Sequence, residues 1–403
     1  MISNRVGTPV RGKDFYGRDA FVQLVSDKLK AGHVLLAAPR RFGKTSVMYR
    51  LIDEPRWNYR VVHADLEKFS EPSELIAHLV EQLARDDKLA KLLKGVKWLP
   101  ETIWQFFRKN FEEVELFEVK IKLKEQLRQH WQERGEELFR RVAKSDETII
   151  FILDEFPMMI DRMARTKGHR QEAITLLRWL RAIRTSPETG NVRFLIAGSI
   201  GIDQVLNELG EIKSINDFEK LALTPFSPKV AAAFLTDLAA THSLNLSPAC
   251  KRKMLELIGT PVPYFLQILF SEIHKAHAQD GENVTPKKVE QLYRERVLGA
   301  DCKTYFEHYY GRLRDYYQPN EEKAAKRILR ELAVVEAARR DACWEHYKEI
   351  IGHKADLDSF NQMMADLEND FYLRYDEQAR RYEFACKLLR DWWLRHYGME
   401  AGA

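Results

Sequence analysis

Short apolar runs alternate with amphipathic stretches over the first half of the chain. Four of these runs have the length of a strand: HVLLAA (residues 33–38), YRVVHADL (59–66), TIIFILDE (148–155) and VRFLIAGS (192–199). TIIFILDE is apolar up to its acidic end, as expected for a strand buried on both faces of a parallel sheet. The segments between the runs carry apolar residues at helical spacing. This alternation predicts an α/β fold in which a parallel sheet has helices on both faces.

The pattern changes near Phe226, where LTPFSP interrupts it. From there to about residue 300 the spacing predicts helices only. After a linker at residues 316–320, helical stretches precede an alternating segment at residues 371–384 and a last helix. Helices followed by a β-hairpin are typical of a winged helix. We therefore expect three domains, at residues 1–226, 227–300 and 301–403.

The segment at residues 95–145 is expected to be an insertion in the first domain. Its positions Val114, Leu116, Val119, Ile121 and Leu123 alternate as in a hairpin, before a charged helix from Lys124 to Val142. Aromatic residues also gather there (Trp98, Trp104, Phe106, Phe107 and Phe111). Such side chains belong to a core more often than to a docking surface.

The charge balance of the chain is close to neutral. Among 403 residues, 64 Lys and Arg face 60 Asp and Glu, which leaves a net charge of +4 and gives no argument of its own for nucleic acid. No apolar run approaches the roughly 18 residues of a membrane helix, and the start of the chain lacks a signal peptide's apolar core. We therefore expect a cytoplasmic protein without a membrane partner. Its four cysteines show no metal-ligand spacing.

The segment APRRFGKTS, residues 38–46, fits the phosphate-binding loop GxxxxGK[ST], except that Ala38 replaces the first glycine. A strand is expected before it and a helix after it, so that backbone N–H groups and the positive end of the helix converge on phosphates. Lys44 should contact the β- and γ-phosphates, and the Thr45 hydroxyl should coordinate Mg²⁺. The expected nucleotide-binding residues are Pro39, Arg40, Arg41, Phe42, Gly43, Lys44, Thr45 and Ser46.

A second motif, FILDE, ends the apolar run at residues 148–155. At the end of a strand near the loop, Asp154 would hold Mg²⁺ through its water shell. Glu155 would then orient or deprotonate an attacking water. Alone, this motif is as easily a strand ending in a solvated acidic turn. Together with the loop it favours a nucleotide-hydrolysing site.

Three further features could complete such a site. Ser199, after the run at residues 192–198, could reach the γ-phosphate or the attacking water, or it could cap a helix. Arg178, Arg181 and Arg184 recur along one helix, and a solvated basic face is the simpler explanation for all but Arg184, which could act on a neighbouring subunit as an arginine finger. Gly17 and Arg18 could contact the nucleotide base or form an ordinary turn.

These residues resemble a known group: the archaeal-type predicted ATPases, which are AAA+ and STAND-like P-loop ATPases related to origin-recognition ATPases. The resemblance rests on FYGR, PRRFGKTS, FEVKIKL, FILDEFPMM, LRAIR, FLIAGSIG, SINDF, LTPFS, GTPVPYFLQIL and YEFACKLLRDWW, and it covers nearly the whole chain. It implies a nucleotide domain, a helical lid and a C-terminal winged helix, with ATP or ADP and Mg²⁺ as ligands. The adenine side would be contacted by Gly17, Arg18 and a lid proline, Pro261 or Pro263, of which we take Pro263.

The predicted third helix of the winged helix does not suit DNA. Residues 355–370 carry five acidic side chains and no Lys or Arg, whereas a helix in a DNA groove faces phosphates. Residues 303–403 hold 17 basic and 19 acidic side chains. We therefore expect an ATPase that acts as a nucleotide-driven conformational switch, with a protein partner or self-association. The alternatives are a DNA-stimulated ATPase of the replication-regulator kind and a nucleotide-bound scaffold that hydrolyses slowly.

Overall fold

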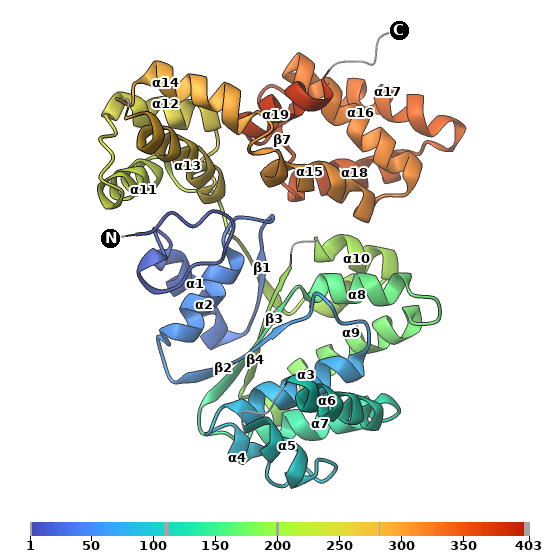
Figure 1. Cartoon of the computed structure of the whole chain (residues 1–403). Helices are drawn as coiled ribbons and strands as arrows, with labels where there is room; N and C mark the ends of the chain where they lie inside the picture. Colours follow the sequence, from blue (N-terminus) through green and yellow to red (C-terminus); the bar gives the residue numbers. More distant parts are fainter. Residues whose placement is uncertain (1, 109–112, 199–200, 282, 399–403) are drawn as a thin grey trace. The chain divides into compact units, whose positions relative to one another are not determined.

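The computed structural model describes residues 2–108, 113–198, 201–281 and 283–398 (Figure 1). It divides into two compact units. The sheet unit comprises Arg18–Ala38 and Lys44–Leu223, and the helical unit comprises Met1–Gly17, Pro39–Gly43 and Thr224–Ala403. The expected three-domain division, with boundaries at residues 226 and 300, stays a prediction.

The sheet unit is built on five parallel strands in the order β2-β3-β4-β1-β5. The strands are β1 (His33–Ala37), β2 (Tyr59–Asp65), β3 (Thr148–Asp154), β4 (Val192–Gly198) and β5 (Phe218–Ala222). The first four coincide with the predicted apolar runs. β5 was not expected, because this five-residue edge strand buries only Leu221 and has no apolar run.

Helices cover both faces of this sheet (Figure 1). α1 (Asp19–Ala31) and α2 (Lys44–Asp53) lie on one face. The opposite face is covered by α3 (Pro72–Arg85), α4 (Ala90–Leu93), α5 (Glu101–Arg108), α6 (Glu113–Arg128), α7 (Trp131–Val142), α8 (Phe156–Arg165), α9 (Arg170–Thr185) and α10 (Ile202–Leu209). Leu35, Phe151 and Phe194 belong to the core beneath these helices. Their sequence neighbours Val34, Ile152 and Leu195 are buried as well, as strands covered on both faces require.

The insertion at residues 95–145 is helical, and the expected hairpin is wrong. α6 spans Glu113–Arg128, where alternation predicted two strands. Val119, Leu123 and Leu127 recur every four residues and pack into the core, whereas Ile121 is exposed. Helical periodicity therefore decides this segment. Of its aromatic residues, Trp104 and Phe107 are buried, Trp98 and Phe106 are partly buried against the core, and Phe111 lies outside the described residues.

The first part of the helical unit contains four helices, α11 (Pro228–Thr241), α12 (Pro248–Ile258), α13 (Pro263–Asp280) and α14 (Pro286–Leu292), followed by a π-helical turn at Tyr293–Val297. Three of them begin with the same signal. Ser227, Ser247 and Thr285 each accept a hydrogen bond from a backbone N–H of the helix and are followed by proline. The side-chain oxygen satisfies an N–H that the first helical turn leaves free, and proline needs no hydrogen-bond donor there.

The remainder of the helical unit combines helices with short strands, and its assignment as a winged helix stays a prediction. It contains α15 (Lys303–Tyr316), α16 (Pro319–Val335), β6 (Ala337–Arg339), α17 (Arg340–Ile351), α18 (Leu357–Asn369), β7 (Leu373–Asp376), β8 (Arg381–Phe384) and α19 (Lys387–Tyr397). β7 and β8 form the expected hairpin. The unexpected β6 pairs with β8 and completes a three-stranded antiparallel sheet.

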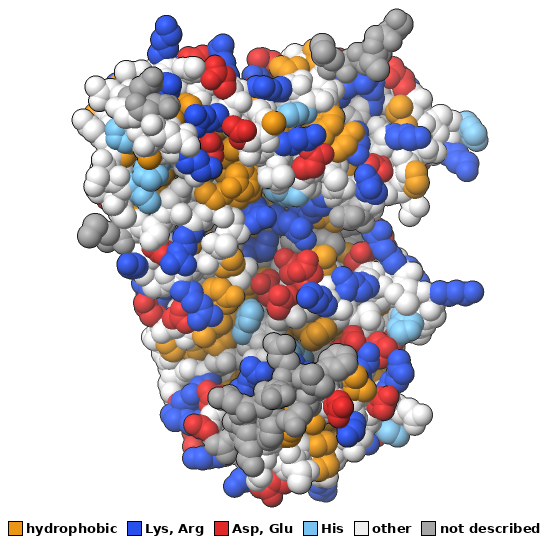
Figure 2. Space-filling model, in the orientation of Figure 1, with side chains coloured by type: hydrophobic (Ala, Val, Ile, Leu, Met, Phe, Trp, Pro, Cys, Tyr) orange, Lys and Arg blue, Asp and Glu red, His pale blue; other side chains and the backbone are white. Residues whose placement is uncertain are grey.

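Charged side chains of both signs are mixed over the face shown in Figure 2, in line with the near-neutral balance of the sequence. Within the described ranges, helices that combine the length and the apolar character needed to cross a bilayer do not occur. The four cysteines are free and buried.

Candidate nucleotide-binding site

The loop between β1 and α2 turns sharply before the helix begins. Arg41 and Gly43 both have positive φ, at 69° and 96°. A Cβ on Gly43 would meet no atom within 4 Å, so the backbone conformation rather than crowding favours glycine there. α2 begins at Lys44, directly after this turn. The free N–H groups of its first turn therefore lie next to the loop, as an anion site requires.

Lys44 is buried, and its position explains why alanine is accepted at residue 38. The Lys44 Nζ donates a hydrogen bond to the Ala38 carbonyl oxygen, at 2.6 Å. This bond uses the backbone of residue 38 and makes no demand on its side chain. Ala38 also does not have a positive φ. The departure from the glycine of the usual motif therefore costs the loop neither its conformation nor its contact with the lysine.

Asp154 and Thr45 approach one another at the carboxyl end of the sheet. Asp154 is the last residue of β3, in register with Asp65 at the end of β2. The Thr45 Oγ1 lies 3.4 Å from the Asp154 Oδ2, and the aspartate is buried. Burial raises the pKa of Asp154 to about 6, with repulsion from Glu155 adding to the effect and Lys44 opposing it. The positive charge of Lys44 therefore does not fully compensate the buried carboxylate.

Glu155 follows in a left-handed conformation, with φ of 53° and ψ of 27°. Its backbone N–H donates to the Asp154 Oδ1 at 3.0 Å, and its carbonyl accepts from Met158 and Met159 at the start of α8. A non-glycine residue in this region stores strain, which is common at functional sites. The turn is also tightly enclosed, because a Cβ on Gly198, at the end of β4, would lie 2.6 Å from Pro157.

Thr45 and Asp154 fit a magnesium ion. A hydroxyl and a carboxylate are oxygen ligands of the kind that Mg²⁺ prefers, and the two oxygens lie 3.4 Å apart. In the part of the chain that the structure describes, groups of three or more His, Cys, Asp or Glu able to hold a metal are absent. Water and phosphate oxygens would supply the other ligands, as is usual for Mg²⁺.

Comparison with known proteins agrees with this geometry. Residues 28–206, which include the loop, Asp154 and Glu155, match the family model described as an AAA domain. This part of the chain is an AAA domain. Residues 28–206 therefore have the fold of an AAA-type P-loop ATPase domain.

Solved structures with the same fold span almost the whole chain. A Walker-type ATPase of Pyrococcus abyssi shares 16% sequence identity, with 96% of this chain and 99% of that chain covered and a TM-score of 0.60. The ORC2 protein of Aeropyrum pernix, in ADPNP and ADP complexes, shares 12% identity over 95% and 92% of the two chains, with a TM-score of 0.52. At these identities the likeness shows the fold. None of the proteins with curated descriptions matches the sequence.

Two residues of the AAA domain's loop contact residues that are distant in the sequence. Arg41 donates to the Gly7 carbonyl at 2.6 Å, and its guanidinium lies 5.0 Å from the centre of the Tyr264 ring. Phe42 is buried and meets Phe371 edge to face, with ring centres 4.8 Å apart. Sequence reasoning placed Arg41 and Phe42 at the nucleotide and missed these partners, because no local pattern links positions so far apart.

Three residues were expected to contact the adenine: Gly17, Arg18 and Pro263. Gly17 has a φ of 65°, and a Cβ there would lie 2.5 Å from Val230. Arg18 is buried, and burial lowers the pKa of its guanidinium to about 10. Pro263 is the first residue of α13. Contact of these residues with a base stays a prediction.

The remaining catalytic candidates have different outcomes. Ser199 lies outside the described residues. The Arg184 side chain is 1% exposed, and it donates to both carboxylate oxygens of Asp217 at 2.8 and 2.9 Å. A guanidinium held in this way is not presented to a second subunit, so the structure does not support the arginine-finger prediction. Arg178 is exposed and forms an ion pair with Glu211, which agrees with a solvated basic face.

Proposed function

We propose that the protein binds ATP with Mg²⁺, hydrolyses it and uses the nucleotide cycle as a conformational switch. The observation that carries the site is the approach of Thr45 Oγ1 to Asp154 Oδ2, next to the buried Lys44. The preference for adenine nucleotide draws support from the Aeropyrum pernix protein of the same fold, solved with ADPNP and ADP.

Each residue has a distinct part in the proposed reaction. Backbone N–H groups at the start of α2 bind the phosphates, and Lys44 exchanges the Ala38 carbonyl for the β- and γ-phosphate oxygens. Thr45 and Asp154 would hold a magnesium ion, which would supply positive charge next to the transferred phosphoryl group. Glu155, on the strained turn, orients the attacking water and accepts its proton.

The switch is supported by the contacts of the loop. Arg41 and Phe42 are held by Gly7, Tyr264 and Phe371 of the helical unit. A triphosphate in the loop would compete for the conformation of residues 39–43. We therefore propose that ATP binding loosens or rearranges these contacts and that hydrolysis restores them.

Other contacts within the helical unit would transmit the change. The Thr260 Oγ1 donates to the Ala385 carbonyl at 2.6 Å, and the Cys386 thiol contacts the Ile258 carbonyl at 3.1 Å. A Cβ on Gly259 would lie 2.8 Å from Lys387. The α12–α13 loop and the start of α19 are therefore joined closely enough to respond together.

Turnover by the Glu155→Gln variant tests the catalytic part. We expect ATP affinity within about twofold of the wild type and a loss of turnover of roughly 10²–10⁴-fold, because the water loses its base. A suitable control is Glu219→Gln, an exposed residue of β5 paired with Lys28. Equal turnover in Glu155→Gln and wild type would remove Glu155 from the mechanism.

The Phe371→Ala variant tests the switch separately. If the Phe42–Phe371 contact holds a nucleotide-free conformation, its loss should raise ATP affinity or change the hydrogen exchange of residues 39–43. Phe360→Ala, a buried aromatic substitution on α18, controls for general loosening of this part. Unchanged affinity and exchange in Phe371→Ala would exclude this contact from the switch and leave the ATPase proposal intact.

DNA stimulation is the second candidate, and the structure does not favour it. α18, the helix in the position that would read DNA, spans Leu357–Asn369 and contains no Lys or Arg. Its cap, Asp356, adds another negative charge. Turnover measured with and without duplex DNA at two salt concentrations decides the matter, since phosphate contacts weaken steeply with salt. A salt-sensitive increase in turnover would favour the DNA-stimulated ATPase.

The scaffold alternative has a different signature. It predicts tight ATP binding with no measurable turnover in the wild type. The aromatic cluster offered as its docking surface is largely internal, because Trp104 and Phe107 are buried in the core. Sedimentation with and without ATP would show whether copies of the chain associate.

A further inference from the structure

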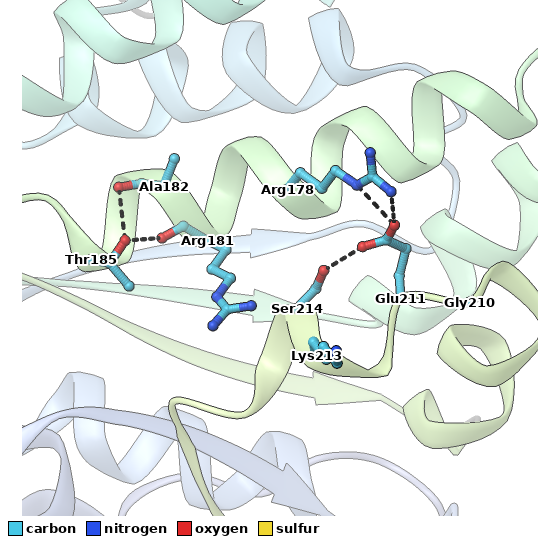
Figure 3. A pocket seen from close by; sticks show the side chains of 8 residues that line it. All are labelled: Arg178, Arg181, Ala182, Thr185, Gly210, Glu211, Lys213 and Ser214. Atoms are coloured by element: carbon cyan, nitrogen blue, oxygen red, sulfur yellow. Dashed lines mark hydrogen bonds and ion pairs between the residues drawn. The ribbon is translucent and has the colours of Figure 1, made fainter.

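The sheet unit contains a polar cavity that lies away from the AAA domain's loop. It has a volume of about 450 Å³ and lies between α9 and the segment that precedes β5 (Figure 3). Its lining residues are Arg178, Arg181, Ala182, Thr185, Gly210, Glu211, Lys213 and Ser214. This volume is within the range of small-molecule sites, roughly 300–1,000 Å³.

The strand directions place this cavity at the opposite edge of the sheet from Asp154. The end of α9 comes before β4, and Lys213 comes before β5, so both lie near the amino ends of parallel strands. Asp154 lies at the carboxyl end of β3. A strand of five to seven residues separates the two edges by roughly 15–25 Å. A ligand in the cavity would thus be distinct from the nucleotide.

The one acidic residue in the lining is already satisfied. Arg178 donates to the Glu211 Oε1, at 2.8 Å from Nε, and the Ser214 hydroxyl donates to the Oε2 at 2.9 Å. The hydrogen bond from Arg178 holds the pKa of Glu211 below its ordinary value. Figure 3 shows both interactions. Glu211 therefore cannot also neutralise the other cations.

Two cations in the lining lack such a partner. Arg181 is half-buried and extends from α9 toward the segment that carries Lys213 and Ser214 (Figure 3). Over the described residues, neither the Arg181 guanidinium nor the Lys213 ammonium makes a hydrogen bond or ion pair. The Thr185 hydroxyl donates to the Arg181 carbonyl. The cavity thus offers the N–H donors of two cations and no uncompensated negative charge.

We propose that this cavity binds the phosphoryl group of a small phosphorylated molecule, held by Arg181 and Lys213. A guanidinium and an ammonium match the charge of a phosphate dianion and donate to several of its oxygens. The paired Glu211 keeps Arg178 in place at the rim and excludes a second anion there. The volume beyond the phosphate accommodates the rest of the molecule.

The test is a titration of glycerol 3-phosphate into protein saturated with Mg·ADP, so that the AAA site is filled. We expect one additional binding event in the wild type. Arg181→Gln and Lys213→Gln should each weaken it about 10-fold, and the double variant should abolish it. Lys167→Gln, an exposed residue in the turn between α8 and α9, is the matched control and should bind as the wild type does.

The same titration with nucleotide-free Lys44→Ala protein provides an independent measurement. This variant should still bind glycerol 3-phosphate in the cavity, even if the proposed nucleotide site is wrong. Circular dichroism melts confirm that the surface variants fold. The proposal is overturned if no second event occurs, or if Arg181→Gln and Lys213→Gln bind as tightly as Lys167→Gln. It is also overturned if an oligoglutamate peptide binds where glycerol 3-phosphate does not, or if binding requires association of two chains.

Discussion

Asp154 and Asp217 are two aspartates of the same sheet unit whose pKa values move in opposite directions. Burial raises the pKa of Asp154 to about 6, and the neighbouring Glu155 and Asp65 add to this effect. Burial also acts on Asp217, but the hydrogen bonds and charge of Arg184 outweigh it and lower the pKa. Arg184 outweighs the burial of Asp217, whereas Lys44 only partly offsets the effects that raise the pKa of Asp154.

The difference separates a structural site from a functional one. Around Asp217 the polar groups are mutually satisfied: Arg184 also lies 4.4 Å from the centre of the Phe218 ring, and His33 accepts a hydrogen bond from the Phe194 N–H. Burial lowers the pKa of His33 to about 4, so it is neutral near pH 7. At Asp154 the charges repel one another and the next residue is strained. Such unfavourable terms persist where a ligand will compensate them.

Arg184→Met should show the largest effect. It leaves the Asp217 carboxylate without its cation, and we expect a loss of about 3 kcal/mol in the free energy of unfolding, measured by urea denaturation. Arg178→Met breaks an exposed pair in which the Arg178 side chain is 67% exposed, and it should cost less than about 1 kcal/mol. Similar losses in both variants would contradict a structural role specific to Arg184.

Lys44→Ala should affect nucleotide binding and leave the Asp217 region unchanged. Losing the charged contact to the phosphates should weaken ATP binding by roughly 100-fold, measured with a fluorescent ATP analogue. Lys28→Ala removes a surface pair with Glu219 and is the control. An ATP affinity that survives in Lys44→Ala would refute the assignment of the phosphate-binding loop.

Asparagine substitutions at the two aspartates should change the free energy of unfolding in opposite directions. In nucleotide-free protein near pH 7.5, Asp154→Asn should stabilise the fold by about 2 kcal/mol, because it removes a buried charge that Lys44 compensates only in part. Asp217→Asn should destabilise it, because Arg184 loses its counter-charge. Denaturation of the two variants under the same conditions measures both changes. Destabilisation by Asp154→Asn would show that its carboxylate is compensated within the chain.

The carboxyl edge of the sheet could be predicted because its signals are local. Lys44, Thr45, Asp154 and Glu155 belong to short motifs that each follow an apolar strand, and a parallel sheet brings such strand ends together. The loop and the four strands β1 to β4 were therefore predicted from consecutive residues. The approach of Thr45 Oγ1 to Asp154 Oδ2 agrees with this arrangement of strand ends.

The rest depends on contacts that no short pattern encodes. Arg184 meets Asp217 across 33 positions, and Phe42 meets Phe371 from the far end of the chain. β5 has too few buried residues to produce a signal. The α6 segment was predicted wrongly because its apolar residues fit two patterns, the alternation of a strand and the four-residue spacing of a helix. The helical pattern prevails because α6 packs against α3, where Lys124 pairs with Glu74.

The smallest expected effect is the pH dependence of magnesium binding, which follows from the raised pKa of Asp154. Magnesium requires the ionised carboxylate, so Mg²⁺-dependent ATP affinity should fall about 10-fold from pH 7 to pH 5, through the pKa near 6. The raised pKa also affects the free energy of unfolding. The contribution of Asp154 is complete at pH values below its pKa in the unfolded state, and it is lost as the pH rises through 6. Asp154→Asn should flatten both profiles. A magnesium affinity that is constant over this range in the wild type would place the ion away from Asp154.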